Sequence, residues 1–230
     1  MSSLTPAMRQ YLEIKSRYPD CILFFFFFDF YEMFFEDAVL ASRLLEITLT
    51  SRDKGKEDSV PLCGFPWHAA SSYIARLISK GYKVAVCEQM EDPRFARGVV
   101  KREVVRVVTP GLVLDPDNLE AKQNNFLAGI ALRGEAFGLA FLDVSTGEFR
   151  VTEIVDRSFF LDEVIRHGFR EIVLEEGFRD PLLEAVLARE LEGCVINRFP
   201  RDWFDHGAAL AILGEHVAAD SLARLDPESR

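Results

Sequence analysis

The sequence predicts an α/β protein of two domains, each a β-sheet with helices packed on it. One observation is that apolar strand patterns alternate with amphipathic helix patterns through both halves of the 230-residue chain. The other is a dense turn signal, Thr109-Pro110-Gly111 followed by Asp115-Pro116-Asp117-Asn118, between the halves. We therefore expect a first domain at residues 1–115, a linker at 116–125 and a second domain at 126–230.

The first domain should open with a helix over residues 6–18, because Thr5 is suited to cap it and Pro6 to fill its first turn. A buried strand over residues 21–28 follows, since this run is wholly apolar. Apolar spacing then outlines a second helix through Met33, Leu40, Ala41, Leu44 and Leu45. The triplet Phe30-Tyr31-Glu32 would then lie at a strand-to-helix junction.

The rest of the first domain should alternate short strands with one helix. The predicted elements are a strand at 47–49, a charged mobile loop at 51–59, a helix at 68–80 ended by Gly81, and strands at 83–88 and 99–108. Together they predict a mixed sheet.

The second domain restarts with three strands at 126–132, 136–143 and 148–154. Turn residues at Gly134 and Ser145-Thr146-Gly147 separate them, which is typical of an antiparallel meander. The elements after it should be a helix at 157–166 closed by Gly168, a strand at 171–174, a helix at 181–191, a strand at 194–197 and a helix at 204–213. Three strands followed by alternating helix and strand is the ribonuclease H-like order.

Charge divides the chain unevenly. Residues 1–115 are neutral overall, so the net charge of −10 belongs to residues 116–230. Because phosphate contacts supply much of nucleic-acid affinity, only the first half is a candidate for binding DNA. A basic stretch within it contains Arg94, Arg97, Lys101, Arg102 and Arg106. A solvated strand and loop is the alternative interpretation of that stretch.

Several classes of site are not indicated. The four cysteines are widely separated, and the four histidines form no close pair flanked by carboxylates, so we expect reduced thiols and no metal centre. No catalytic residue is expected, since neither a nucleophile elbow nor a dinucleotide fingerprint is present. The N-terminus lacks a signal peptide, and the longest apolar run is too short to cross a bilayer. These features predict a cytoplasmic protein.

The run FFFFFDFYE at residues 24–32 is the most informative segment. An exposed Phe30 could wedge between base steps from the minor groove, where unstacking is easiest at a mismatched pair. Glu32, two residues on, could hydrogen-bond the displaced base. The alternative is structural: aromatic residues at a strand end are usually core, and a glutamate at a helix start usually complements the helix dipole.

The same segment resembles the mismatch-recognition segment of the MutS family of DNA mismatch repair proteins, whose pattern is Gly-Asp-Phe-Tyr-Glu-hydrophobic-Phe. The resemblance continues in order along the chain through Thr5-Pro6 with Tyr11-Leu12, Gly64-Phe65-Pro66-Trp67-His68-Ala69, Val86-Cys87-Glu88-Gln89, residues 102–111 and Asp143-Val144-Ser145-Thr146-Gly147-Glu148-Phe149. It implies a mismatch-recognition domain followed by a ribonuclease H-like connector domain.

The resemblance also implies roles. Phe30 matches the intercalating phenylalanine and Glu32 the base-contacting glutamate. We expect Tyr31, Leu62, Trp67, Arg102 and Arg106 to complete the DNA-binding set, although packing in the local core is the alternative for Leu62 and Trp67. The implied partners are double-stranded DNA with mismatches or small loops and, through the connector, downstream repair proteins. A dimeric, longer parent would be the ATPase that needs ATP and magnesium.

Two departures from the family pattern stand out. Phe26-Phe27-Phe28 replaces the usual Arg-x-Gly, and a glycine at position 28 would permit a backbone conformation that phenylalanine resists. The 230 residues also contain no P-loop, so no cofactor is expected in this chain.

Two other functions compete for the second domain. One is a ribonuclease H-like nuclease, which would need carboxylates converging on two metal ions; Asp143 is its best candidate residue. The other is a protein-docking module that uses the acidic surface.

Overall fold

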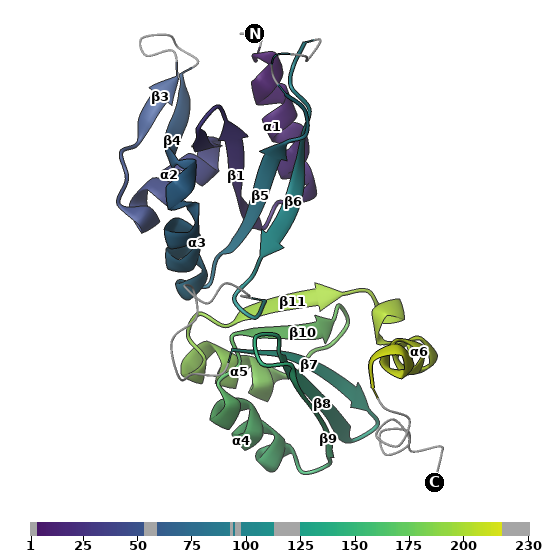
Figure 1. Ribbon diagram of the computed structural model, residues 1–230. Coiled ribbons are helices and arrows are strands. Elements are labelled where there is room, and N and C mark those ends of the chain that lie inside the picture. Colours follow the sequence, from purple (N-terminus) through teal and green to yellow (C-terminus); the bar gives the residue numbers. More distant parts are fainter. Residues whose placement is uncertain (1–3, 53–58, 93, 95–97, 113–124, 218–230) are drawn as a thin grey trace. The chain divides into compact units, whose positions relative to one another are not determined.

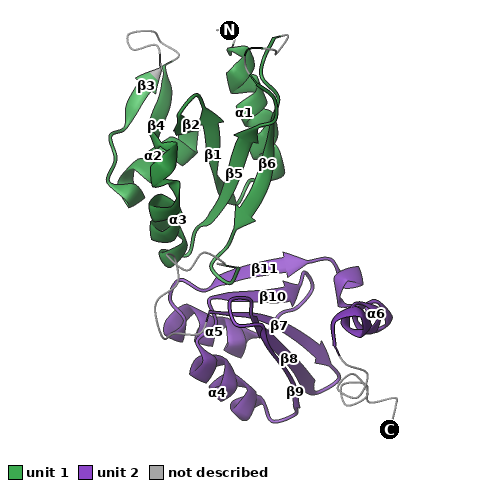
Figure 2. Cartoon of the chain, in the orientation of Figure 1, with its two compact units in different colours: residues 1–123 green, residues 124–230 purple. Residues whose placement is uncertain are grey.

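The computed structural model describes residues 4–52, 59–92, 94, 98–112 and 125–217. The chain divides into two compact units, residues 1–123 and 124–230 (Figures 1 and 2). Each unit is a mixed sheet with helices packed on it, as the sequence predicts. Of the expected linker at 116–125, all but Asn125 lies outside the described residues.

Unit 1 contains a six-stranded sheet in the order β3-β4-β2-β1-β5-β6. Strands β1 and β5 are parallel, and every other neighbouring pair in this sheet is antiparallel. The elements are α1 (Pro6–Arg17), β1 (Cys21–Phe27), β2 (Phe30–Phe34), α2 (Phe35–Leu45), β3 (Thr50–Arg52), β4 (Val60–Pro66), the 3-10 helix η1 (Trp67–Ala69), α3 (Ala70–Ser79), β5 (Lys83–Gln89) and β6 (Arg102–Val108).

Helices cover both faces of this sheet. One face packs against α2 and α3 through residues such as Phe24 and Met33. The opposite face packs against α1 through Leu23 and Phe25, and we refer to it as the α1 face. Because successive residues of β1 are buried against different helical layers, its sequence is continuously apolar rather than alternating.

A buried polar network fastens α1 to the sheet. The Thr5 side chain caps the helix by accepting the Met8 N–H. The Asp37 carboxylate accepts hydrogen bonds from the Tyr11 hydroxyl at 2.9 Å and the Leu23 N–H at 3.0 Å, and it pairs with Lys15 at 2.8 Å. Burial, followed by the charge of Asp37, raises the pKa of Tyr11, so this hydroxyl stays a hydrogen-bond donor.

The predicted strand-to-helix junction is wrong. Phe30 to Glu32 lie on strand β2, which pairs with β1 as a hairpin, and the helix begins only at Phe35. Met33, expected on the helix, is a buried strand residue. The two residues that connect the strands are Phe28 and Asp29, a pair without the glycine or asparagine that usually marks such a turn.

Two further differences concern the edge strand β3 and its neighbour β4. The short strand expected at 47–49 lies instead at Thr50–Arg52, and most of the expected loop at 51–59 falls outside the described residues. Strand β4 is not predicted, because its two prolines and one glycine argue against a strand. The helix ended by Gly81 and the strand at Lys83–Gln89 are confirmed.

Unit 2 contains a five-stranded sheet in the order β11-β10-β7-β8-β9. The antiparallel meander β7-β8-β9 is confirmed, and β10 and β11 add in parallel. The elements are β7 (Phe126–Arg133), β8 (Ala136–Asp143), β9 (Glu148–Ile154), α4 (Arg157–His167), β10 (Glu171–Glu175), α5 (Pro181–Glu190), β11 (Val195–Phe199), the 3-10 helix η3 (Arg201–Phe204) and α6 (His206–His216).

Candidate nucleic-acid interface

The β1–β2 hairpin presents aromatic rings to solvent at its tip. Phe28 is 71% exposed, Phe30 45% and Trp67 56%, and we name these three residues the aromatic tip. They are held together by the backbone: Phe30 pairs with Pro66 across β2 and β4, and the Trp67 N–H donates to the Asp29 carbonyl at 2.9 Å. Exposed rings on a hydrogen-bonded hairpin form a rigid apolar projection suited to stacking.

Strand alternation places Phe30 and Glu32 on one face of β2, the α1 face, together with Phe34. Gly64 lies directly across from Glu32 on β4. A Cβ atom at Gly64 would come within 2.8 Å of the Tyr31 carbonyl oxygen and 3.4 Å of Glu32 Cγ. Only glycine therefore lets β4 approach β2 this closely beside the half-buried glutamate.

Leu62 is on the same face, opposite Phe34, but it is half-buried and packs against the core under α1. Trp67 differs from it, because its ring is mostly exposed at the start of η1. Of these two expected contacts, the structure brings Trp67 to the aromatic tip and leaves Leu62 deeper, at the level of Phe34.

Tyr31 faces the opposite side of the hairpin from Phe30. Its side chain is only 7% exposed, and its hydroxyl donates to the Glu88 carboxylate on β5. Burial and then this hydrogen bond raise the pKa of Tyr31. The structure thus places Tyr31, which we expected to contact DNA, within the core, where its ring supports the hairpin.

Arg102 is also internal, although the sequence suggested a DNA contact. It is 6% exposed, and its guanidinium donates to the Phe26 carbonyl at 2.8 Å and to Gln10 at 3.0 Å. The same group lies over the rings of Phe25 and Phe27, at 4.8 and 5.2 Å from their centroids. Burial lowers the pKa of Arg102. Arg102 thus ties β6, β1 and α1 together beneath the hairpin.

The other residues of the basic stretch that the structure describes are exposed, but two of them have acidic partners. Arg94 pairs with Asp92 at 2.7 Å and Lys101 with Glu103 at 2.7 Å. Arg106 is exposed on β6 opposite Val86, while Arg97 lies outside the described residues. Arg106 is the expected phosphate contact that the structure leaves at the surface.

Unit 2 gives no support to a nuclease site. Asp143 is 1% exposed and accepts hydrogen bonds from the Ser145 hydroxyl at 2.6 Å, the Ser145 N–H at 2.9 Å and the Asn125 N–H at 3.1 Å. Burial alone would raise the pKa of Asp143, but these hydrogen bonds outweigh it and hold the pKa below its usual range. Asp143 is therefore a turn-capping residue. No group of three or more potential metal ligands occurs among the residues that the structure describes.

Two residues that matter to the site were not singled out as site residues from sequence. Phe28 was noted only as a departure from a glycine pattern, yet it is the most exposed ring of the tip. Gly64 was noted only within a motif, yet its missing side chain lets β4 approach the Tyr31 carbonyl beside Glu32. The exposure of the Phe28 ring and the close approach of β4 to β2 both depend on how the strands pair. The sequence does not predict β2 or β4, so it does not predict this pairing.

Fold and surface together define a two-domain α/β protein whose first domain presents a hairpin with exposed aromatic rings at its tip. Comparison with known proteins makes this specific: residues 5–117 match MutS domain I, and residues 125–225 match MutS domain II. The chain belongs to the MutS family.

Individual relatives agree over most of the chain. It is 52% identical over 224 residues to the DNA mismatch repair protein MutS of Syntrophobacter fumaroxidans, covering 96% of this chain and 25% of that protein. The corresponding protein of Ruminiclostridium cellulolyticum is 47% identical over 225 residues, covering 96% and 26%. That of Acetivibrio thermocellus is 56% identical over 175 residues, covering 75% and 20%. The chain thus spans about a quarter of the length of the first two relatives.

Proposed function

We propose that unit 1 binds duplex DNA and recognises mismatches or small loops by wedging Phe30 between base steps from the minor groove. The observation that carries the proposal is the placement of this ring: it is 45% exposed on a strand whose neighbours Tyr31 and Met33 are buried. A ring fixed in this way enters a duplex without first having to be ordered.

The energetics favour weakened duplex sites. Wedging a ring into a base step costs a few kcal/mol of unstacking, and a mismatched or unpaired site has already lost part of that stacking. Stacking on the ring returns about 1–3 kcal/mol per base. The unstacking cost therefore exceeds the stacking gain in matched DNA, whereas the gain exceeds the cost at a mismatch or unpaired base. One ring is then sufficient to discriminate between matched and mismatched duplex.

Glu32 and the remaining exposed residues would complete the interface. Glu32 shares the face of Phe30, two residues along the strand, so its carboxyl group is suited to hydrogen-bond the base that the ring displaces. Trp67 lies beside the tip, and Arg106 offers a guanidinium for a phosphate.

Competition binding tests the proposal. The 230-residue chain is incubated with a labelled heteroduplex and competed with matched duplex, and the same is done for Phe30→Ala and for Phe159→Ala as a control. Phe159 is an exposed phenylalanine of unit 2, 55% exposed on α4. We expect wild type and Phe159→Ala to prefer the heteroduplex and Phe30→Ala to lose that preference, by roughly fivefold or more. Equal preference in wild type and Phe30→Ala would remove Phe30 from the mechanism.

The relatives are about four times longer, and further properties are proposed for a protein of that length. ATP hydrolysis with magnesium and dimerisation would belong to regions beyond the two matched domains. Unit 2 would be the connector that docks downstream repair proteins, since the net charge of −10 over residues 116–230 disfavours phosphate contacts.

A cytoplasmic location is proposed as well. The four cysteines are free thiols, which suits a reducing compartment. Within the described residues, no helix is long and apolar enough to span a membrane.

A further inference from the structure

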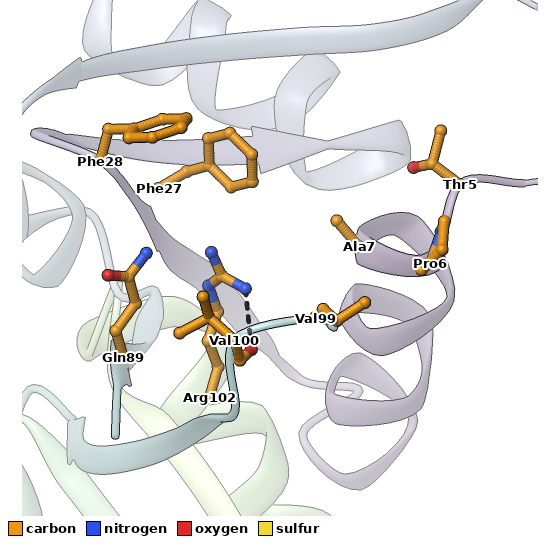
Figure 3. A pocket seen from close by; sticks show the side chains of 9 residues that line it. All are labelled: Thr5, Pro6, Ala7, Phe27, Phe28, Gln89, Val99, Val100 and Arg102. Atoms are coloured by element: carbon orange, nitrogen blue, oxygen red, sulfur yellow. Dashed lines mark hydrogen bonds between the residues drawn. The ribbon is translucent and has the colours of Figure 1, made fainter. Parts of the chain in front are cut away.

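A cavity of about 310 Å³ lies beside the hairpin tip (Figure 3). The rings of Phe27 and Phe28 form one side of it, and Gln89 and Val100 face them from the opposite side. The first turn of α1 closes one end, and the guanidinium of Arg102 lies between the two sides. This volume is at the lower end of the range for ligand sites, so it suits a single ring system rather than a large molecule.

The cavity is adjacent to the proposed wedge. Phe27 and Phe30 are direct partners across the β1–β2 pair, so their side chains point to the same face. Neighbouring strands are about 4.8 Å apart, which places the Phe27 wall of the cavity one strand away from Phe30. A base pushed aside by Phe30 is therefore within one strand spacing of this opening.

The chemistry of the lining matches a nucleobase. Aromatic and aliphatic walls accept a flat ring, and the ring planes of Phe27 and Phe28 lie at 85° with centroids 4.9 Å apart. The side-chain amide of Gln89 makes no hydrogen bond to another residue in the described part of the chain, so its donor and acceptor are both available to the edge of a base. The buried charge of Arg102, which is 6% exposed, favours the carbonyl oxygens and π-faces that bases carry.

Phe28 adds an independent observation. Its backbone has φ +56°, a left-handed conformation that disfavours side chains with a Cβ, and its ring is 71% exposed. Residues with a strained backbone conformation are concentrated at functional sites, and this one also presents a large ring to solvent. Here that ring forms the outer part of the cavity wall.

We propose that this cavity holds one nucleobase displaced from the duplex beside Phe30, with the ring of Phe28 stacking on it and Gln89 hydrogen-bonding its edge. The inference rests on the proposed function, because Phe30 must first open the duplex. It adds a second recognition element, which reads the presence of an extruded base rather than the weakness of the base step.

Two bulged duplexes test the cavity. They are identical except that the single unpaired residue is 2-aminopurine in one and an abasic site in the other; a matched duplex serves as reference. Wild type should bind the 2-aminopurine bulge roughly fivefold or more tightly than the abasic bulge, with a change in 2-aminopurine fluorescence. Phe28→Gly and Gln89→Leu should lose that difference, whereas Phe28→Tyr, which keeps a ring, should retain it. Thermal unfolding of each variant verifies that the fold is intact.

The outcomes separate the two proposals. If wild type prefers the abasic bulge over matched duplex and Phe30→Ala loses that preference, the wedge stands. Suppose that, in addition, wild type binds the 2-aminopurine bulge no more tightly than the abasic bulge, or that Phe28→Gly and Gln89→Leu still show the wild-type difference in affinity between the two. Either result overturns the cavity inference and leaves the wedge intact. If wild type prefers neither bulge over matched duplex, the proposed function fails and the cavity inference fails with it.

Discussion

At the scale of single residues, Phe28 is where this chain departs most from its family pattern. The resemblance led us to expect glycine there, and the structure gives the reason: the hairpin turn requires a positive φ at this position. For a residue with a Cβ, such a conformation costs about 1–2 kcal/mol. The hairpin forms nonetheless, because pairing on both sides and the buried core of β1 and β2 determine its path.

The strain at Phe28 predicts a difference between two substitutions. Phe28→Gly and Phe28→Ala both remove the ring, but only glycine relieves the backbone. We expect the free energy of unfolding of Phe28→Gly to exceed that of Phe28→Ala by about 1 kcal/mol, since the unfolded-state entropy of glycine offsets part of the relief. Urea denaturation measures this. Equal stability of the two variants would show that the turn carries no such strain.

The sequence assigned the exposed and buried aromatic residues of this segment only in part. Phe30 and Glu32 were identified by resemblance, and the structure puts them on one face of β2. Tyr31 was expected at the surface as part of the Phe30-Tyr31-Glu32 triplet, and Arg102 as part of the basic stretch. Their burial depends on partners distant in sequence, Glu88 for Tyr31 and Phe26 for Arg102, which one-dimensional patterns do not show.

At the scale of elements, the β1–β2–β4 unit carries the site. The sequence missed β2 because the Phe28-Asp29 turn lacks a turn signal, and it missed β4 because proline and glycine disfavour strands. In β4 these residues are tolerated, since Pro61 lies outside the part of β4 that pairs with β2 and Pro66 is the last residue of the strand. Gly64 has a further use, because it admits β4 close to Glu32.

Gly64→Ala should therefore damage both the fold and the site. The added Cβ would lie 2.8 Å from the Tyr31 carbonyl oxygen, so β4 must shift, and we expect a loss of about 1–3 kcal/mol in the free energy of unfolding. Displacement of Glu32 should also reduce the preference for heteroduplex over matched duplex.

Gly129→Ala is the matched control, because this glycine also lies in a strand, β7, but a Cβ there meets nothing within 4 Å. It should unfold within about 0.5 kcal/mol of wild type or be slightly more stable. If Gly64→Ala proves as benign as Gly129→Ala, the close approach of β4 to β2 does not constrain the site.

At the scale of the whole molecule, the division into an α/β sheet unit followed by a meander unit was predictable. The second unit was predicted most closely, since its elements have strong local signals: Asp156 and Asp180 cap α4 and α5, and Gly168 ends α4 with a positive φ. The strands of the first unit were harder to predict from sequence. Both faces of its sheet are buried, so apolar and polar residues do not alternate along its central strands.

The charge distribution predicts how the chain responds to salt. Residues 1–115 are neutral and residues 116–230 carry −10, so few phosphate contacts are available. With two to four such contacts, affinity for DNA should fall about tenfold to a hundredfold between 50 and 200 mM salt. Fluorescence anisotropy across this range measures the slope. Sub-micromolar affinity of the isolated 230 residues at physiological salt would contradict the expectation of weak binding.

The most direct test of the wedge is the environment of the Phe30 ring when DNA is bound. NMR spectra of the chain with 13C-labelled phenylalanine, in which Phe30→Leu identifies the Phe30 signals, can be recorded with heteroduplex and with matched duplex. We predict an upfield ring-current shift of the Phe30 protons and contacts to base protons with heteroduplex only. Phe30 signals that stay at their free positions while heteroduplex is bound would contradict recognition by this ring.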